Sequence, residues 1–291
     1  MYHNNLIKKM KNLRKTITLL IVIGLLGSFS SSAFSLSSEW IDNEVSQVRL
    51  ISPFTHNNDQ KELILGLQYK MKPGWKTYWQ SPGDGGFAQN ISWENSTNIE
   101  KVEIKWPTPL EFEILGLQSL GYENEVIFPL LLKFKDKKEL TNFDLSINYL
   151  TCKDICIPGN ARIFLPIPAG LAKTTKYHHI LEKTTSNLPQ TNLELSSISN
   201  LEVKAFKNEK DVLIEIKAKT FQKFNNTKIF LHTPFGLPVV NNSFQYSADY
   251  KTLISSFNFD KKFFSKENFE IKVLLGDYNH NFSYIDKVAL E

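Results

Sequence analysis

The sequence predicts an all-β protein of two antiparallel β-sandwich domains joined by a short, partly helical connector. Three observations support this fold class. Apolar and polar residues alternate over many short segments, turn signals separate those segments, and helical periodicity is almost absent. With its 291 residues the chain exceeds the usual size of one domain, which favours two.

The first 35 residues predict an export signal. The apolar run at 17–27, ITLLIVIGLLG, is too short to cross a bilayer, which takes about 20 residues. Ala33-Phe34-Ser35 resembles a cleavage site, so we expect cleavage after Ser35, with retention as an anchor as the alternative. An exported chain reaches a compartment in which disulfides form. The run is preceded by the basic residues Lys8, Lys9, Lys11, Arg14 and Lys15.

The net charge of +4 belongs to this export segment. It would become −1 after cleavage, because the segment holds five basic residues and no acidic ones. Elsewhere lysine and glutamate are interspersed, without the basic stripe of a nucleic-acid-binding protein. We therefore expect no nucleic-acid partner.

Residues 36–168 are expected to form the first sandwich. Apolar residues occupy alternate positions over 63–71, and they alternate strictly with polar ones over 143–149. This period of two is typical of a strand with one buried face. The segment Pro82-Gly83-Asp84-Gly85-Gly86 predicts a turn. Further strands are expected at 46–52, 102–106, 125–135 and 161–167.

Residues 169–195 are richer in Thr, Ser, Asn and Lys and predict a connector with a short helix near 175–184. Residues 196–291 return to strand patterns and are expected to form the second sandwich. Its predicted strands are 199–206, 212–216, 227–232, 252–258, 269–273 and 282–289.

The only two cysteines, Cys152 and Cys156, are expected in the connection between a strand ending near residue 151 and one beginning near Ala161. An extended chain would separate their Cα atoms by about 13 Å. A disulfide needs them within about 7 Å, so the chain must turn between them. Pro158 and Gly159 fit a bent segment outside the ladder.

Such a disulfide suits redox chemistry better than stability. In the chain-entropy model a loop this small stabilises by about 2 kcal/mol, against about 4.7 for a loop of a hundred residues. A metal site is the second interpretation, since two thiolates can hold Cu(I). It lacks an evident third ligand, because Met71 and the five histidines that follow the export signal all lie outside the cysteine loop.

The residues around the cysteines do not decide which thiol attacks first. Lys153 would favour a thiolate and Asp154 would oppose it. The sequence contains no G-x-S-x-G, H-E-x-x-H or phosphate-loop motif, so other common enzyme classes are set aside and no cofactor is expected.

The cysteine segment, Tyr149-x-x-Cys152-Lys-Asp-Ile-Cys156-Ile-Pro158, resembles the motif of the amino-terminal domain of thiol:disulfide interchange protein DsbD. The similarity is greatest to the suppressor-of-copper-sensitivity B branch. Other stretches carry the same resemblance in the same order along residues 46–168. They are Gly74-Trp75-Lys-Thr-Tyr78-Trp79-Gln-Ser-Pro82-Gly83-Asp84-x-Gly86, Trp106-Pro107, Gly121-Tyr122 and Phe128-Pro129.

The resemblance implies an immunoglobulin-like sandwich in the periplasm with a reversible disulfide at one end. It implies thiol–disulfide exchange with a membrane-embedded thiol reductase and thioredoxin-like periplasmic proteins. Cys156 would form the mixed disulfide with partners, and Cys152 would be the resolving thiol. The chain has no thioredoxin-type C-x-x-C, so its electrons are expected from a separate protein.

The family also implies a capping loop over the disulfide. Phe112 is the candidate cap, and Glu111, Glu113 and Asp154 are candidate proton-handling neighbours. For the aromatic group of Trp75, Tyr78 and Trp79, packing at the sandwich rim is favoured over shielding of the disulfide. Tyr149 is predicted to be a core residue whose hydroxyl reaches a polar group.

We therefore predict an exported protein that exchanges disulfides through Cys152 and Cys156. Two alternatives remain open at this point. One is a copper-handling protein that binds Cu(I) through the same thiolates. The other is a binding or assembly module in which the disulfide only shapes a loop.

Overall fold

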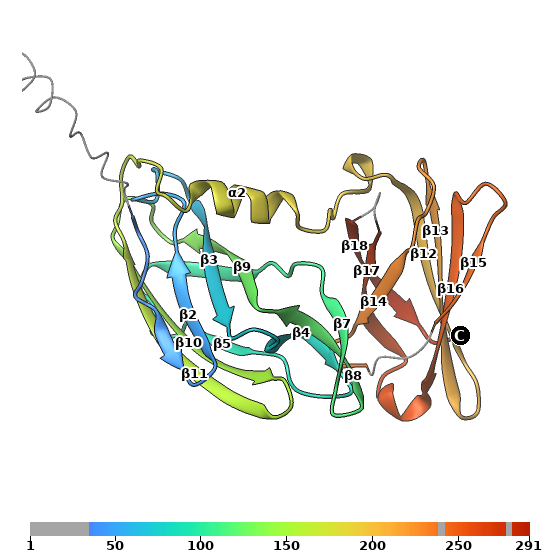
Figure 1. The fold of residues 1–291 in the computed structure, drawn as a ribbon. Coiled ribbons are helices and arrows are strands. Elements are labelled where there is room, and N and C mark those ends of the chain that lie inside the picture. The colour runs from blue at the N-terminus through green and yellow to red at the C-terminus, as the bar shows by residue number, and fades with distance from the viewer. Residues whose placement is uncertain (1–34, 238–241, 278–280) are drawn as a thin grey trace, which may run out of the picture. The chain divides into compact units, whose positions relative to one another are not determined.

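The computed structural model describes residues 35–237, 242–277 and 281–291. The predicted export signal lies outside the described residues, except for Ser35. Most of the described chain forms antiparallel strands (Figure 1). The prediction of an all-β protein with immunoglobulin-like sandwiches is confirmed.

The first pair of sheets is built from residues 41–167. One sheet has the strand order β1-β2-β3-β9-β6, and the other has the order β11-β10-β4-β8-β7, with β5 paired to β10. The five-stranded sheet comprises β1 (Ile41–Asn43), β2 (Ser46–Ile51), β3 (Glu62–Met71), β6 (Ile99–Ile104) and β9 (Glu125–Phe134). The facing sheet comprises β4 (Lys76–Gly83), β5 (Asn90–Ser92), β7 (Leu110–Ile114), β8 (Leu117–Glu123), β10 (Thr141–Cys152) and β11 (Cys156–Ile167).

One apolar core lies between these two sheets. From Gly159 onward, β11 alternates strictly between buried and exposed residues, as expected of an edge strand with one face on the core. Tyr149 is buried in this core, and its hydroxyl is hydrogen-bonded to Asn43 Nδ2 and Ser46 Oγ. The prediction for Tyr149 is confirmed.

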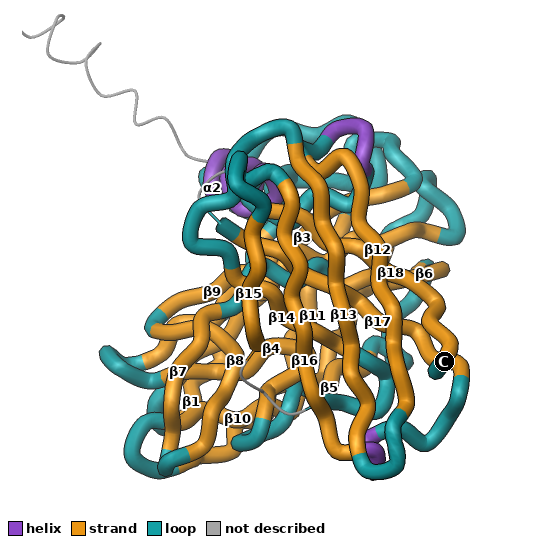
Figure 2. Tube along the Cα trace, turned by 90° about the vertical axis from the view of Figure 1, so that its right-hand side faces the viewer, coloured by secondary structure: helices purple, strands orange, loops and turns teal. Residues whose placement is uncertain are grey.

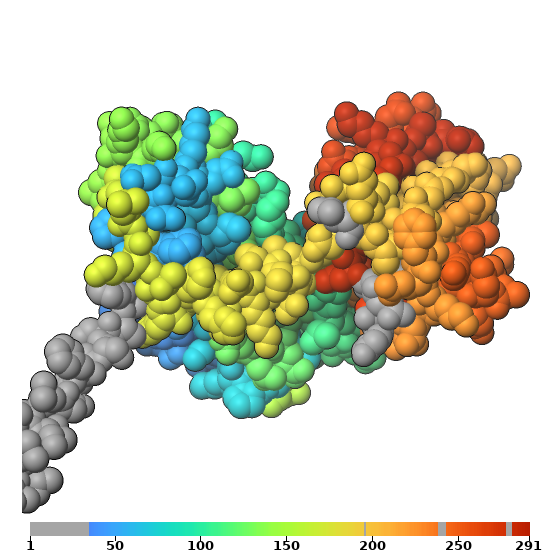
Figure 3. Space-filling view, turned by 90° about the horizontal axis from the view of Figure 1, so that it is seen from above, coloured from blue at the N-terminus to red at the C-terminus, as the bar shows by residue number. Residues whose placement is uncertain are grey.

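Helix α2 (His178–Ser186) covers part of the outer face of the five-stranded sheet. Leu181 and Tyr177 form a small apolar cluster with Ile51 and Ile127, and Figure 3 shows this segment in yellow beside the blue strands. The helix begins three residues later than predicted. Thr175 N–H donates to the Pro53 carbonyl, which ties this part of the chain to an extended segment before the helix can start.

The second pair of sheets is built from residues 198–289, with its own apolar core. One sheet has the order β12-β13-β16-β15, whose strands run side by side in Figure 2. Its strands are β12 (Ile198–Lys207), β13 (Asp211–Thr220), β15 (Asn242–Tyr246) and β16 (Thr252–Asp260). The other sheet comprises β14 (Lys228–His232), β17 (Asn268–Gly276) and β18 (Asn281–Ala289).

Two short 3-10 helices, η1 (Leu193–Leu195) and η2 (Lys261–Phe263), complete the described elements. Residues Ser35–Glu291 pack as one compact unit. The domain boundaries at residues 168 and 196 therefore stay a prediction. Within the described residues, no helix has the length and apolar character needed to cross a membrane.

Candidate functional site

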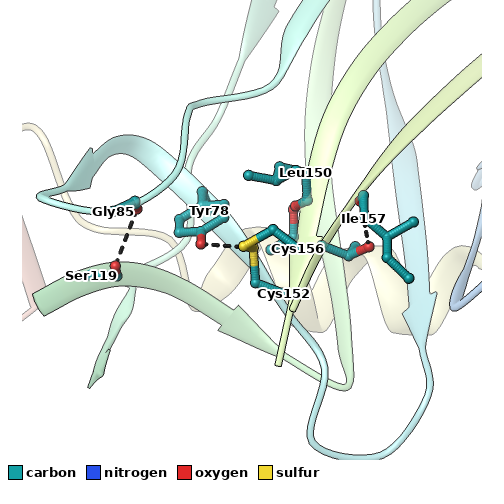
Figure 4. Close-up of a disulfide and its surroundings, with 9 residues drawn as sticks. Tyr78, Gly85, Ser119, Leu150, Cys152, Cys156 and Ile157 are labelled. Carbon is teal, nitrogen blue, oxygen red and sulfur yellow. Dashed lines mark hydrogen bonds between the residues drawn. A yellow bond between two sulfur atoms is a disulfide. The ribbon is translucent and has the colours of Figure 1, made fainter. Parts of the chain in front are cut away.

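The two cysteines lie at the closed end of the β10–β11 hairpin. β10 ends at Cys152, β11 begins at Cys156, and the two residues are partners in the ladder. Their Cα atoms are 4.1 Å apart and their sulfur atoms form a disulfide (Figure 4). In the turn between them, Lys153 N–H donates to the Ile155 carbonyl over 3.0 Å. The hairpin register itself therefore places the cysteines side by side.

The expectation of a bent connection lasting to Ala161 is wrong. Pro158 and Gly159 belong to the ladder, opposite Leu150 and Tyr149. β11 is an edge strand, where a proline is tolerated because one row of backbone groups has no ladder partner. Gly159 fits because a Cβ at that position would overlap the Tyr149 ring. The strand therefore continues through both residues to Cys156.

The two sulfur-bearing residues differ in exposure. Cys152 is 0% exposed, whereas Cys156 is exposed to solvent. The sheet order explains the difference. Cys152 lies between β11 and β4, where it faces Lys76 of β4, whereas Cys156 lies on the edge strand. Cys156 is therefore the more accessible of the two residues.

Cys152 is covered by a small cluster of its own. Tyr78, Ile114 and Leu150 are buried around it, and Phe112 packs against them. The Tyr78 hydroxyl donates a hydrogen bond to Cys152 Sγ over 3.0 Å (Figure 4). Burial raises the pKa of Tyr78, so this hydroxyl keeps its proton through the neutral range. The buried sulfur thus faces a hydrogen-bond donor.

Charged groups lie near the disulfide without forming an acid–base pair with it. Lys76 Nζ is 5.7 Å from the centre of the Phe112 ring and 3.4 Å from Glu123 Oε1. Lys153 and Asp154 are exposed in the turn. Asp154, a predicted proton-handling neighbour, therefore lies in solvent at the tip of the hairpin, and a proton-handling role for it stays a prediction.

The pleat of β7 places the side chains of the predicted cap on two opposite faces of the strand. Phe112 and Ile114 face the Cys152 cluster, and the Phe112 ring centre is 6.1 Å from that of Tyr78. Glu111 and Glu113 project from the opposite face, since successive side chains of a strand alternate. Glu111 pairs with Lys228 at 2.5 Å, and Glu113 accepts a hydrogen bond from Gln118. The structure therefore brings Phe112, but neither carboxylate, to the disulfide.

Sequence reasoning missed the particular role of Tyr78. It treated Trp75, Tyr78 and Trp79 as one aromatic group at the rim. In β4 the neighbours Tyr78 and Trp79 point to opposite faces, so Tyr78 reaches Cys152 while Trp79 packs against Phe230 and His232. If a strand had been predicted from Lys76 onward, the alternation of its side chains would have placed the Tyr78 and Trp79 rings on opposite faces.

A metal centre receives no support from the geometry. Among residues 35–237, 242–277 and 281–291, no group of three or more His, Cys, Asp or Glu side chains is arranged to hold an ion. The site therefore consists of a disulfide, a buried hydroxyl and an apolar cover. This arrangement can carry out thiol–disulfide exchange at the exposed sulfur.

Comparisons with known proteins agree with this geometry. The family model described as thiol:disulfide interchange protein DsbD, N-terminal, matches residues 44–168. Among solved structures, the chain is similar to the N-terminal periplasmic domain of ScsB from Proteus mirabilis, with a TM-score of 0.67. That similarity covers 89% of this chain and 100% of the ScsB chain at 20% identity, and it concerns the fold. A comparison with curated proteins gives no match.

The family match contains the whole β10–β11 hairpin and every residue of the Cys152 cluster. The resemblance predicted from the cysteine and aromatic motifs is confirmed. Residues 44–168 match the model of the DsbD amino-terminal family, whose description is that of a thiol:disulfide interchange protein, and the fold of the chain is similar to that of the ScsB domain.

Proposed function

We propose that this protein passes electrons between a membrane-embedded thiol reductase and oxidised periplasmic proteins, through reversible opening of the Cys152–Cys156 disulfide. The observation that carries the proposal is the asymmetry of that disulfide. Cys156 is an exposed residue on the edge strand, and Cys152 is buried with its sulfur against the Tyr78 hydroxyl. A staple needs no such asymmetry, whereas exchange needs one sulfur that partners can reach.

The electrons balance in two exchange steps. A thiolate of a reduced, thioredoxin-like partner attacks Cys156 Sγ, which forms a mixed disulfide and releases Cys152 as a thiolate. A second thiol of the partner then attacks the partner's first sulfur, which is bonded to Cys156 Sγ in the mixed disulfide. That bond breaks, and Cys156 leaves as a thiolate. The partner ends as a disulfide, and this protein ends as a dithiol that has gained two electrons.

Delivery of electrons runs the same steps in reverse. The Cys156 thiolate attacks the disulfide of an oxidised protein, and Cys152 resolves the mixed disulfide that results. The partners are expected to be thioredoxin-like, as the family resemblance implies. A periplasmic location is supported by the ScsB structure, which is a periplasmic domain, and by the predicted export signal.

Trapping of the mixed disulfide tests the proposal. A Cys152→Ser variant keeps the exposed thiol but cannot resolve the intermediate, so it should accumulate a covalent complex with an oxidised thioredoxin-like protein. The matched Cys156→Ser variant keeps only the buried thiol and should trap little or none. Equal trapping by both variants would contradict the assigned roles, and no trapping by either would contradict exchange.

A further inference from the structure

Tyr78 contributes a buried hydroxyl that touches a reacting sulfur. Its side chain is 1% exposed, and its O–H points at Cys152 Sγ (Figure 4). A buried hydroxyl needs a hydrogen-bond partner, and here that partner is a sulfur. Sulfur in a disulfide is a weak acceptor, whereas an ionised acceptor forms a hydrogen bond about twice as strong. This bond therefore strengthens as the disulfide opens.

The protein holds the Tyr78 ring in place from several sides. Gly86 adopts a φ of +94°, and a Cβ at that position would overlap the ring. The turn that carries Gly86 is fixed to β8. Ser119 Oγ donates to the Gly85 carbonyl over 3.1 Å (Figure 4). In addition, Asp84 N–H donates to the Gln118 carbonyl. Phe112 contacts the cluster from β7. The hydroxyl is thus oriented before the reaction begins.

We propose that Tyr78 is a catalytic residue whose hydroxyl stabilises the Cys152 thiolate as it leaves. This inference rests on the proposed exchange function and adds one residue to it. A partner thiolate forms its bond to Cys156 Sγ, the Cys152–Cys156 bond breaks, and the electron pair departs on Cys152 Sγ. Tyr78 donates to that charge without giving up its proton, which agrees with the raised pKa of its hydroxyl.

The Tyr78 hydroxyl would stabilise a thiolate at a position that solvent does not reach. Cys152 is fully buried, so water cannot stabilise a thiolate there without an opening of the cluster. A fixed donor replaces that missing solvation and costs no reorganisation during the reaction. The same hydrogen bond makes Cys152 a better leaving group, because it lowers the pKa of the thiol.

The test compares Tyr78→Phe with the wild-type chain in reduction of the disulfide by dithiothreitol. Phenylalanine keeps the ring against Gly86 and removes only the hydroxyl. The expected second-order rate constant is about tenfold lower, the loss given by a charge-assisted hydrogen bond of about 1.4 kcal/mol. The matched control is Tyr122→Phe, which removes another buried hydroxyl, one that donates to the Pro107 carbonyl over 2.7 Å. The control should reduce at the wild-type rate.

A second readout separates chemistry from packing. In a Cys156→Ser background, Tyr78→Phe should raise the pKa of the Cys152 thiol by about one unit, whereas Tyr122→Phe should leave it unchanged. A loss of stability alone would not move this value. The thiol is titrated through its thiolate absorbance under conditions in which each variant is folded.

The outcomes distinguish this inference from the proposed function. If the wild-type disulfide reduces readily and Tyr78→Phe changes neither the rate nor the pKa, Tyr78 only packs and the inference fails while exchange stands. If the wild-type disulfide itself resists dithiothreitol, exchange fails and the inference fails with it. Slower reduction together with a raised thiol pKa supports both.

Discussion

Two hairpins of this protein have turns of the same length but end in different surroundings. The β10–β11 hairpin turns over residues 153–155, and the β12–β13 hairpin turns over residues 208–210. Both turns are closed by a short backbone hydrogen bond, Lys153 N–H to Ile155 O in the first and Asn208 N–H to Asp211 O in the second. The two turns therefore have the same length of three residues, although the hydrogen bond spans two residues in the first and three in the second.

The closed ends differ in burial. β12 ends at an exposed lysine, and its turn is exposed, whereas the last four residues of β10, 149–152, are all buried. The reason is the neighbouring strand. β4 pairs with the end of β10 and brings Tyr78, while β12 is an edge strand. Packing against β4 and its Tyr78 thus buries Cys152, whereas Cys156 on the edge strand stays exposed.

The largest effect should be the order in which the two thiols react. In the reduced protein, Cys156 should be alkylated faster than Cys152 by on the order of tenfold or more, because burial withdraws the second thiol from the reagent. Rates measured in the two single-cysteine variants check this expectation. Equal rates would mean that the Cys152 cluster opens freely, and the comparison between the two hairpin ends would then lose its basis.

Acid should act on a partly buried group of the second pair of sheets, His232. Burial, together with the charge of Lys272, lowers the pKa of His232 to about 4. An unfolded histidine titrates near 6.5, so protonation favours unfolding. The contribution of neutral His232 to the free energy of unfolding is complete above about pH 6.5 and is lost as the pH falls toward about 4. The free energy of unfolding should be about 2 kcal/mol lower at about pH 5 than at about pH 8.

Denaturant titrations of two histidine variants, repeated at several pH values, check that His232 causes this pH dependence of the free energy of unfolding. His232→Gln should flatten the pH dependence, whereas His179→Gln should retain it, since the His179 side chain is 92% exposed. An unchanged profile in His232→Gln would assign the acid sensitivity to other groups.

Two glycines with positive φ provide a matched pair of positions for testing whether the turn at Gly86 holds the Tyr78 ring in place. Gly86 has φ +94° and lies against the Tyr78 ring, whereas Gly116 has φ +79° and open space within 4 Å of where a Cβ would stand. Alanine at either position carries backbone strain of about 1–3 kcal/mol. Gly86→Ala should cost more than Gly116→Ala and should also slow reduction of the disulfide. Equal losses of stability and unchanged reduction would show that the ring is not held by this turn.

The smallest effect is expected from the apolar cover. Phe112→Ala in a Cys156→Ser background should speed alkylation of Cys152 several-fold, because it removes part of the Cys152 cluster. Phe164→Ala is the control, since this ring is 54% exposed on β11. A Phe112→Ala variant that reacts like the control would show that Phe112 does not cap the disulfide.

The sequence was sufficient for the parts of the fold that follow a simple period. Strands such as 143–149 and 212–216 were predicted because they have one buried face. β4 was not predicted as a strand, because Trp79 is buried on one face and Tyr78 on the other, so polar and apolar residues do not alternate. The start of β11 was missed because Pro158 and Gly159 normally mark a turn.

The candidate site was predictable in its chemistry but not in its surroundings. The two cysteines follow from a motif within a short segment of sequence, and Phe112 was named as a candidate cap from the family resemblance. The contact between Tyr78 and Cys152 spans 74 residues, and the pairing of Glu111 with Lys228 spans 117. Such contacts depend on the order of strands in the sheets, which local patterns do not determine.

The central claim is that the Cys152–Cys156 disulfide opens and closes in the working protein. Its reduction potential, titrated against glutathione in the mature chain and followed by thiol alkylation, tests this claim most directly. We expect a value between about −270 and −120 mV, the range of known exchange proteins. A potential below about −300 mV, which is typical of structural disulfides, would contradict it.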